Sequence, residues 1–179
     1  MIKKYKLPAM ITYTTVFDKT KDGYDYVEAC KILEQYGCEI VGLNCGRGPD
    51  TMMPLLKGIR AAVKCYVAAQ PVPYATTPDR QVFHFLQDRK GQRAFPLALE
   101  RHLLSRFEMA EFAREAKELG INYIGICCGG APYHVRDMAE ALERKVPASR
   151  YSADMSLHGT LGSDKVVKKG ETKFREQWK

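Results

Sequence analysis

Residues 39–69 read EIVGLNCGRGPDTMMPLLKGIRAAVKCYVAA. Two short apolar runs, 39–43 and 65–69, have the length and the β-branched content of strands. Between them, apolar residues recur at helical spacing as far as Val63, and Asp50 or Thr51 can cap the start of that helix. A strand, a crossover helix and a second strand form a parallel βα unit. Strands that run apolar without alternation are covered on both faces.

The same alternation extends in both directions along the chain. Four units follow one another, with predicted strands at 9–14, 39–43, 65–69 and 122–126 and predicted helices at 24–36, 50–63, 107–119 and 135–142. Residues 71–105 are irregular, with a short helix around 81–87, and 145–179 show no period. The fold class is therefore α/β. An open doubly wound sheet and half of an eight-stranded (β/α) barrel both fit this pattern.

The composition excludes several classes of protein. A chain of 179 residues with 45% hydrophobic residues is long enough for one domain and too apolar for disorder. It has no apolar run that would cross a membrane, and its first residues lack the apolar core of a signal peptide, so we expect a soluble, cytoplasmic protein. The net charge of +7 comes from 1–6 and 145–179, whereas 7–144 are neutral. A nucleic-acid partner is not expected, because such proteins carry their basic surplus on the folded face.

Three cysteines stand at the ends of predicted strands. Cys45 follows the second strand, and Cys127 and Cys128 follow the fourth, just before Gly129-Gly130. Ligands bind at the carboxyl ends of parallel strands, and the glycines allow the chain to curl so that both neighbouring sulfurs turn inward. Three thiolates with an open fourth position describe a catalytic zinc site. Buried inert thiols, or a vicinal disulfide between Cys127 and Cys128, are the alternatives.

The other candidate ligands have simpler explanations. Cys30, Cys38 and Cys65 fit buried small hydrophobic residues. None of the histidines follows a strand, so we expect them at the surface or beside the metal ligands: His84, His102, His134 and His158.

The two cysteine motifs are Gly42-Leu43-Asn44-Cys45 and residues 125–129, Gly-Ile-Cys-Cys-Gly. They resemble the G-[VL]-N-C and G-G-C-C-G strand ends of a known family, the zinc-dependent homocysteine S-methyltransferases. Residues 132–136, Pro-Tyr-His-Val-Arg, resemble the P-Y-H-I-R of its betaine-using branch. The likeness spans about residues 7–147.

Two residues depart from the family pattern. Ile126 replaces the second glycine of G-G-C-C, and Gly46 stands where the betaine-using branch often has a histidine. The first departure affects a backbone approach to homocysteine, and the second affects the surroundings of the metal.

The resemblance implies a fold, a cofactor and a reaction. Residues 1–147 would form strands five to eight of a (β/α)8 TIM-type barrel, and 148–179 a C-terminal extension that can serve as an oligomerisation arm anchored by Trp178. Cys45, Cys127 and Cys128 would bind Zn²⁺. Homocysteine would accept a methyl group, with betaine as the expected donor, to give methionine.

The resemblance leaves the substrate contacts and the partners open. Candidate substrate-binding residues are Asn44, Gln70, Tyr74 and Ile126. Aromatic rings that can surround a quaternary ammonium group, or simply pack, are Tyr13, Tyr74 and Tyr133. The chain would form a homo-oligomer or pair with a chain that carries the first half of the barrel. The alternatives are a non-catalytic zinc-binding half-barrel subunit, a fragment that needs a partner, or an enzyme with S-methylmethionine or methyl-cobalamin as donor.

Overall fold

A computed structural model of the chain describes residues 2–158. The chain divides into two compact units, Met1–Val146 and Pro147–Lys179. The described part of the second unit consists of two short 3₁₀ turns, Pro147–Tyr151 and Met155–Leu157. Trp178, the predicted anchor, lies outside the described residues.

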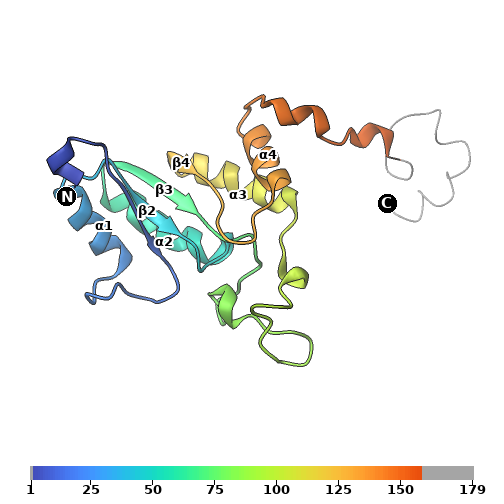
Figure 1. Cartoon of the computed structure of the whole chain (residues 1–179), viewed down its shortest axis with the longest axis horizontal. Helices are drawn as coiled ribbons and strands as arrows, with labels where there is room; N and C mark the ends of the chain where they lie inside the picture. The colour runs from blue at the N-terminus through green and yellow to red at the C-terminus, as the bar shows by residue number, and fades with distance from the viewer. Residues whose placement is uncertain (1, 159–179) are drawn as a thin grey trace, which may run out of the picture. The chain divides into compact units, whose positions relative to one another are not determined.

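The first unit contains one sheet of four parallel strands, in the order β1-β2-β3-β4 (Figure 1). The strands are β1 (Met10–Thr14), β2 (Ile40–Asn44), β3 (Tyr66–Gln70) and β4 (Tyr123–Ile124). The predicted parallel βα units are confirmed. The fourth strand is shorter than predicted, although the N–H groups of Gly125 and Cys127 still donate to the carbonyls of Ala69 and Pro71, along and just beyond β3.

Helices connect the strands and begin at recognisable caps. They are α1 (Tyr26–Gln35), α2 (Pro49–Ala62), α3 (Arg106–Glu118) and α4 (Pro132–Ala141). The side chain of Asp25 caps α1, and Ser105 forms a capping box with Glu108 at α3. The prediction that Asp50 or Thr51 caps α2 is wrong. Gly48 is the N-cap and proline occupies the first turn, where its missing N–H costs nothing.

The main core lies between the helices and one face of the sheet. Val41, Leu43 and Val67 are fully buried there together with Met52 and Leu56 of α2. The opposite face of the sheet carries the alternate residues and is more open. On that face Met10, Ile40 and Tyr66 form a cross-strand row in which Tyr66 is 60% exposed.

The irregular segment 71–105 forms a second, smaller apolar cluster. It contains two 3₁₀ turns, Phe83–Phe85 and Glu100–His102. Its buried members are Val72, Phe83, Leu86, Ala94 and Leu99. Cys45 and Cys127 pack against this cluster. The segment therefore supplies an apolar wall beside two of the candidate zinc ligands. Within residues 2–158, no helix has the length and apolarity needed to cross a membrane.

Candidate metal centre

The three predicted cysteine ligands lie together at the carboxyl edge of the sheet. Cys45 directly follows β2, and Cys127 and Cys128 follow β4. The Sγ atoms of Cys45 and Cys128 are 3.6 Å apart, and those of Cys127 and Cys128 are 3.8 Å apart. All three Sγ atoms lie within 4.8 Å of one another. Among the described residues, no other group of histidine, cysteine or acidic side chains is arranged to hold a metal ion.

The two Sγ–Sγ distances of 3.6 and 3.8 Å fit zinc. Tetrahedral zinc with Zn–S bonds of about 2.3 Å places its sulfur ligands about 3.8 Å apart. The sulfurs are much too far apart for a disulfide, whose S–S bond is about 2.05 Å, and all six cysteines are free. Cys128 is exposed, which also argues against three inert buried thiols. Three corners of a tetrahedron are thus supplied, and the fourth is left for another ligand.

The surroundings of Cys45 change the ionisation of its thiol. Burial, together with hydrogen bonding to the thiols of Cys127 and Cys128, raises the pKa of Cys45 to about 12. The thiol therefore keeps its proton at neutral pH when no metal is bound. A metal that binds as a thiolate complex has to displace that proton.

Backbone hydrogen bonds and a tight turn shape the Cys127-Cys128 loop. The Cys127 N–H donates to the carbonyl of Pro71 at 2.8 Å, which extends the β3–β4 pairing beyond the strands. The chain then turns at Gly129, which has φ +86°. A Cβ at Gly129 would lie 2.3 Å from the hydroxyl oxygen of Tyr74, so the phenol of Tyr74 lies directly against this turn.

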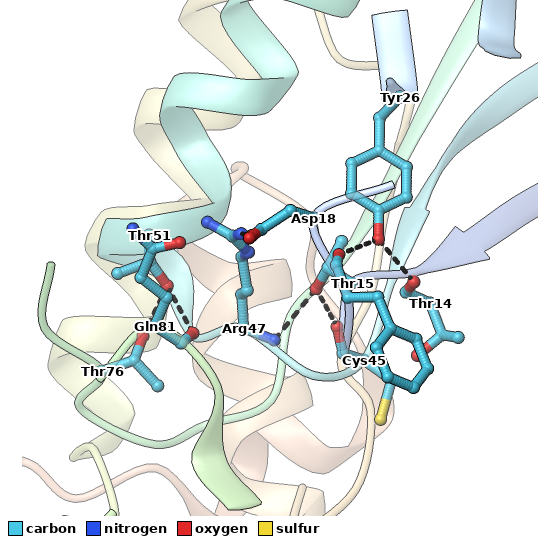
Figure 2. Close-up of polar contacts among 10 residues, drawn as sticks. Thr14, Thr15, Asp18, Tyr26, Cys45, Arg47, Thr51, Thr76 and Gln81 are labelled. Carbon is cyan, nitrogen blue, oxygen red and sulfur yellow. Dashed lines mark hydrogen bonds and ion pairs between the residues drawn. The ribbon is translucent and has the colours of Figure 1, made fainter. Parts of the chain in front are cut away.

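Cys45 sits in an equally constrained turn. Its φ of +56° is left-handed, which is uncommon for a residue with a side chain and costs about 1–2 kcal/mol. The Cys45 N–H donates to the carbonyl of Gln70 at 2.9 Å. Two further residues hold this turn, the buried Thr15 and the buried Arg47 (Figure 2). No sequence pattern marks either residue, because their contacts join segments about thirty residues apart.

The candidate substrate residues divide between the two faces of the sheet. Asn44 and Gln70 are register partners on the face away from the helices, next to Cys45. The Gln70 side chain lies against Gly125. Ile126, by contrast, packs against the main core, so its side chain belongs to the helix-covered side.

The three tyrosines proposed as an aromatic cage do not form one group. Tyr13 lies on the helix-covered face and packs against Tyr26, with ring centroids 6.2 Å apart. Tyr133 packs on His134. Tyr74 stacks on Phe83 at 5.5 Å and is the one tyrosine of the three placed against the cysteine turn.

His134 is neither at the surface nor a ligand, which corrects the expectation that the histidines would be exposed or beside the metal. It is fully buried. Its Nδ1 accepts a hydrogen bond from the Ala131 N–H at 3.1 Å, so its Nε2 donates to the Leu104 carbonyl at 3.0 Å. This pairing caps the start of α4 and ties it to the segment before α3.

Comparison with known proteins assigns the chain to a family. A statistical model of the family described as homocysteine S-methyltransferase matches residues 1–142, which is most of the chain. The chain belongs to the homocysteine S-methyltransferase family. The identification from the cysteine motifs is thereby confirmed.

The relatives in this family are named for two different methyl donors. Betaine–homocysteine S-methyltransferase 1 of Mus musculus is 40% identical over 142 residues, covering 73% of this chain and 32% of the relative. The Danio rerio protein of the same name is 42% identical over 115 residues, covering 62% and 28%. S-methylmethionine–homocysteine S-methyltransferase of Pongo abelii is 37% identical over 142 residues, covering 73% and 36%. The chain thus spans only about a third of the length of these relatives.

Proposed function

We propose that this chain forms the zinc-binding part of an enzyme that transfers a methyl group to the sulfur of homocysteine, giving methionine, with betaine as donor. One observation carries the proposal: three cysteine sulfurs from two separate strand ends lie within 4.8 Å of one another, two of the pairs at the 3.6 and 3.8 Å typical of a zinc tetrahedron, and the fourth corner is left for another ligand. Family membership supports homocysteine as the acceptor. A catalytic zinc site needs the free corner, because the reacting group occupies it.

Bound zinc would supply the Lewis acidity that keeps a homocysteine thiol in its nucleophilic thiolate form at neutral pH. Cys45, Cys127 and Cys128 would hold the metal. The apolar cluster of segment 71–105 covers Cys45 and Cys127 on one side and keeps water from that side. On the open face, Asn44 and Gln70 offer amide groups that can bind the polar end of a substrate.

The proposed architecture is the second half of a (β/α)8 barrel over residues 1–147. The four strands are parallel and in sequence order, as in a barrel. The helices contribute to the core on one face, and the other face carries the partly exposed row of Met10, Ile40 and Tyr66. In a closed barrel that face would point inward. We assign 148–179 the role of an oligomerisation arm and expect the protein in the cytoplasm.

A second donor has nearly equal support. The relative named for S-methylmethionine is 37% identical to this chain, against 40% for the mouse betaine enzyme over the same number of residues. No residue on the open face described above separates a carboxylate-bearing ammonium donor from a carboxylate-bearing sulfonium donor. S-methylmethionine is therefore the alternative donor to test.

A second function is a non-catalytic zinc-binding subunit that pairs with another chain. The observation behind it is the open sheet, whose β1 and β4 edges lack neighbours among the described residues. Parallel sheets are normally covered on both faces. A partner that carries the remaining strands would cover the open face and complete the substrate pocket.

The decisive experiment measures zinc and methyl transfer on the same samples. The purified chain is expected to contain one zinc, and the Cys127→Ser/Cys128→Ser double variant none. Cys65→Ser, which changes a half-buried cysteine outside the cluster, is the matched control and should keep its zinc. Equal zinc in the chain and the double variant would refute the metal site.

Methionine formation from homocysteine is then assayed with betaine and, separately, with S-methylmethionine. Turnover with betaine supports the main proposal, and turnover with S-methylmethionine alone supports the second donor. If the chain binds zinc but turns over neither donor, the assay is repeated with a chain that carries the first half of the barrel. Activity that then appears would identify that chain as the missing part of the enzyme, and no activity would favour the non-catalytic subunit.

A further inference from the structure

The backbone of Cys45 adopts a conformation that is unfavourable for cysteine unless other contacts stabilise it. Cys45 and Gly46 are both left-handed, with φ of +56° and +76°. Glycine adopts this region freely, but cysteine does not. Without outside contacts, Cys45 would relax to the ordinary region, and its side chain would point elsewhere. The direction of its Sγ therefore depends on whatever fixes this turn.

Thr15, the residue after β1, makes the contacts that fix it. Its side chain is fully buried. The hydroxyl of Thr15 donates to the carbonyl of Cys45 and accepts from the N–H of Arg47 at 3.0 Å. One hydroxyl thus joins the residue before Gly46 to the residue after it. Figure 2 shows this hydroxyl between the two backbone groups, with the sulfur of Cys45 pointing away from it.

The main chain of Thr15 also contacts the Cys45 turn. Its N–H lies 3.3 Å from the carbonyl of Asn44 and 3.4 Å from that of Cys45. A Cβ at Gly46 would lie 2.7 Å from the carbonyl carbon of Thr15, so the two chain segments are in direct contact. The turn after β2 is therefore built against the end of β1.

Arg47 links the Cys45 turn to the β1–α1 connection a second time, through its side chain. Its side chain is only 7% exposed, and its Nη2 donates to the exposed carboxylate of Asp18 at 2.9 Å. Asp18 lies three residues after Thr15, in the β1–α1 connection. The Thr15 hydroxyl binds the backbone of Arg47, and Asp18 of the β1–α1 connection binds its side chain.

We propose that Thr15 is a positioning residue for the zinc site: its hydroxyl holds Cys45 in the left-handed conformation that turns Sγ toward Cys127 and Cys128. Thr15 is not one of the three candidate ligands, and its hydroxyl acts through the Cys45 turn. The inference rests on the proposed zinc site. It extends that site to a strand, β1, that contributes no ligand.

Three variants of the full chain test the role of the hydroxyl. Thr15→Val removes it and keeps the shape of the side chain, whereas Thr15→Ser keeps it. Thr51→Val is the matched control, because Thr51 is also a buried threonine, whose hydroxyl contacts Thr76 and the Gln81 carbonyl but not Cys45. Zinc affinity is measured by competition with a chelator. At saturating Co²⁺, the sulfur-to-cobalt charge-transfer band reports the number of Co–S bonds.

We expect Thr15→Val to weaken zinc binding about 10- to 100-fold, the range found when a residue that orients a metal ligand is removed. The intensity of its sulfur-to-cobalt charge-transfer band should fall from the value for three Co–S bonds toward the value for two. Thr15→Ser and Thr51→Val should match the unaltered chain in both measurements.

Residue-resolved alkylation separates a misplaced Cys45 from a misfolded chain. With Co²⁺ bound, Cys45 should become labelled in Thr15→Val while Cys127 and Cys128 stay protected. Cys30, which is fully buried in the core, should stay unlabelled as long as the chain is folded. If Thr15→Val labels Cys30, Thr15→Ala replaces it in the same comparison, since it removes the hydroxyl without placing a methyl group against the polar turn.

The outcomes are distinct. An unaltered chain that binds no zinc refutes the metal site itself. An unaltered chain that binds zinc, with a folded Thr15→Val or Thr15→Ala variant of equal affinity and equal Cys45 protection, overturns the role of Thr15. Loss of Cys45 protection in a folded Thr15→Ser variant overturns it as well.

Discussion

Replacing Gly129 by alanine should damage both the fold and the metal site, for two separable reasons. Gly129 has φ +86°, and a side chain in that region costs about 1–2 kcal/mol. The added Cβ would also lie 2.3 Å from the hydroxyl oxygen of Tyr74 and 2.6 Å from its Cζ, so the ring or the turn must move. Overpacking of this kind costs about 1–3 kcal/mol. The free energy of unfolding should therefore fall by about 2–5 kcal/mol.

Gly91 provides the matched control. Its φ is +77°, but a Cβ there would meet nothing within 4 Å. Gly91→Ala should therefore lower the free energy of unfolding only by the cost of the left-handed backbone, about 1–2 kcal/mol, and should bind zinc normally. Gly129→Ala displaces the turn that carries Cys128, so its zinc affinity should also fall, by up to the about 5- to 150-fold that corresponds to the overpacking energy.

The assay is urea unfolding of the single variants and of a double-mutant cycle with Tyr74→Ala. In the Tyr74→Ala background the added Cβ no longer meets the Tyr74 ring. Gly129→Ala should then lower the free energy of unfolding only about as much as Gly91→Ala does. The reasoning is refuted if Gly129→Ala and Gly91→Ala cost the same in the unaltered chain, or if the cycle shows no coupling between Gly129 and Tyr74.

Three further predictions concern groups away from the metal. Burial raises the pKa of Cys30 to about 12, so iodoacetamide should leave it unmodified between pH 7 and 9 in the folded chain and alkylate it only in urea; modification without urea would contradict its burial. Backbone hydrogen bonds hold the pKa of Glu34 below its usual 4.5, so its contribution to stability is present above that pH and is lost as the pH falls through the lowered value. The stability difference between the chain and Glu34→Gln should therefore be larger at pH 7 than at pH 3, and a difference that does not change with pH would speak against this. His134→Leu should lower the free energy of unfolding by about 2 kcal/mol, because the buried Leu104 carbonyl and the partly buried Ala131 N–H lose their partner, and a neutral effect in urea unfolding would argue against the capping role.

The sequence was sufficient for the elements whose signal is local. Strands β1 to β3 and the four helices follow from apolar periodicity and end within a few residues of their predicted bounds, because the same side chains that create the pattern fill the core. The placement of Cys45 at a strand end follows from the same reasoning.

Features that depend on contacts between distant segments could not be read from the sequence. The sequence predicts one strand over 122–126, whereas β4 covers only Tyr123–Ile124 and the pairing continues through single hydrogen bonds from Gly125 and Cys127. His134 follows no strand, so nothing local marks it as buried, and its partner Leu104 lies thirty residues away. Thr15 and Arg47 matter through the turn at Cys45, whose left-handed backbone has no sequence signature in a residue other than glycine.

The central claim is that Cys45, Cys127 and Cys128 bind one zinc ion and leave one position open. X-ray absorption at the zinc edge of the purified chain counts the sulfur ligands directly. We predict three Zn–S bonds at about 2.3 Å and one lighter ligand. A zinc ion surrounded only by oxygen and nitrogen, or by four sulfurs, would contradict the account.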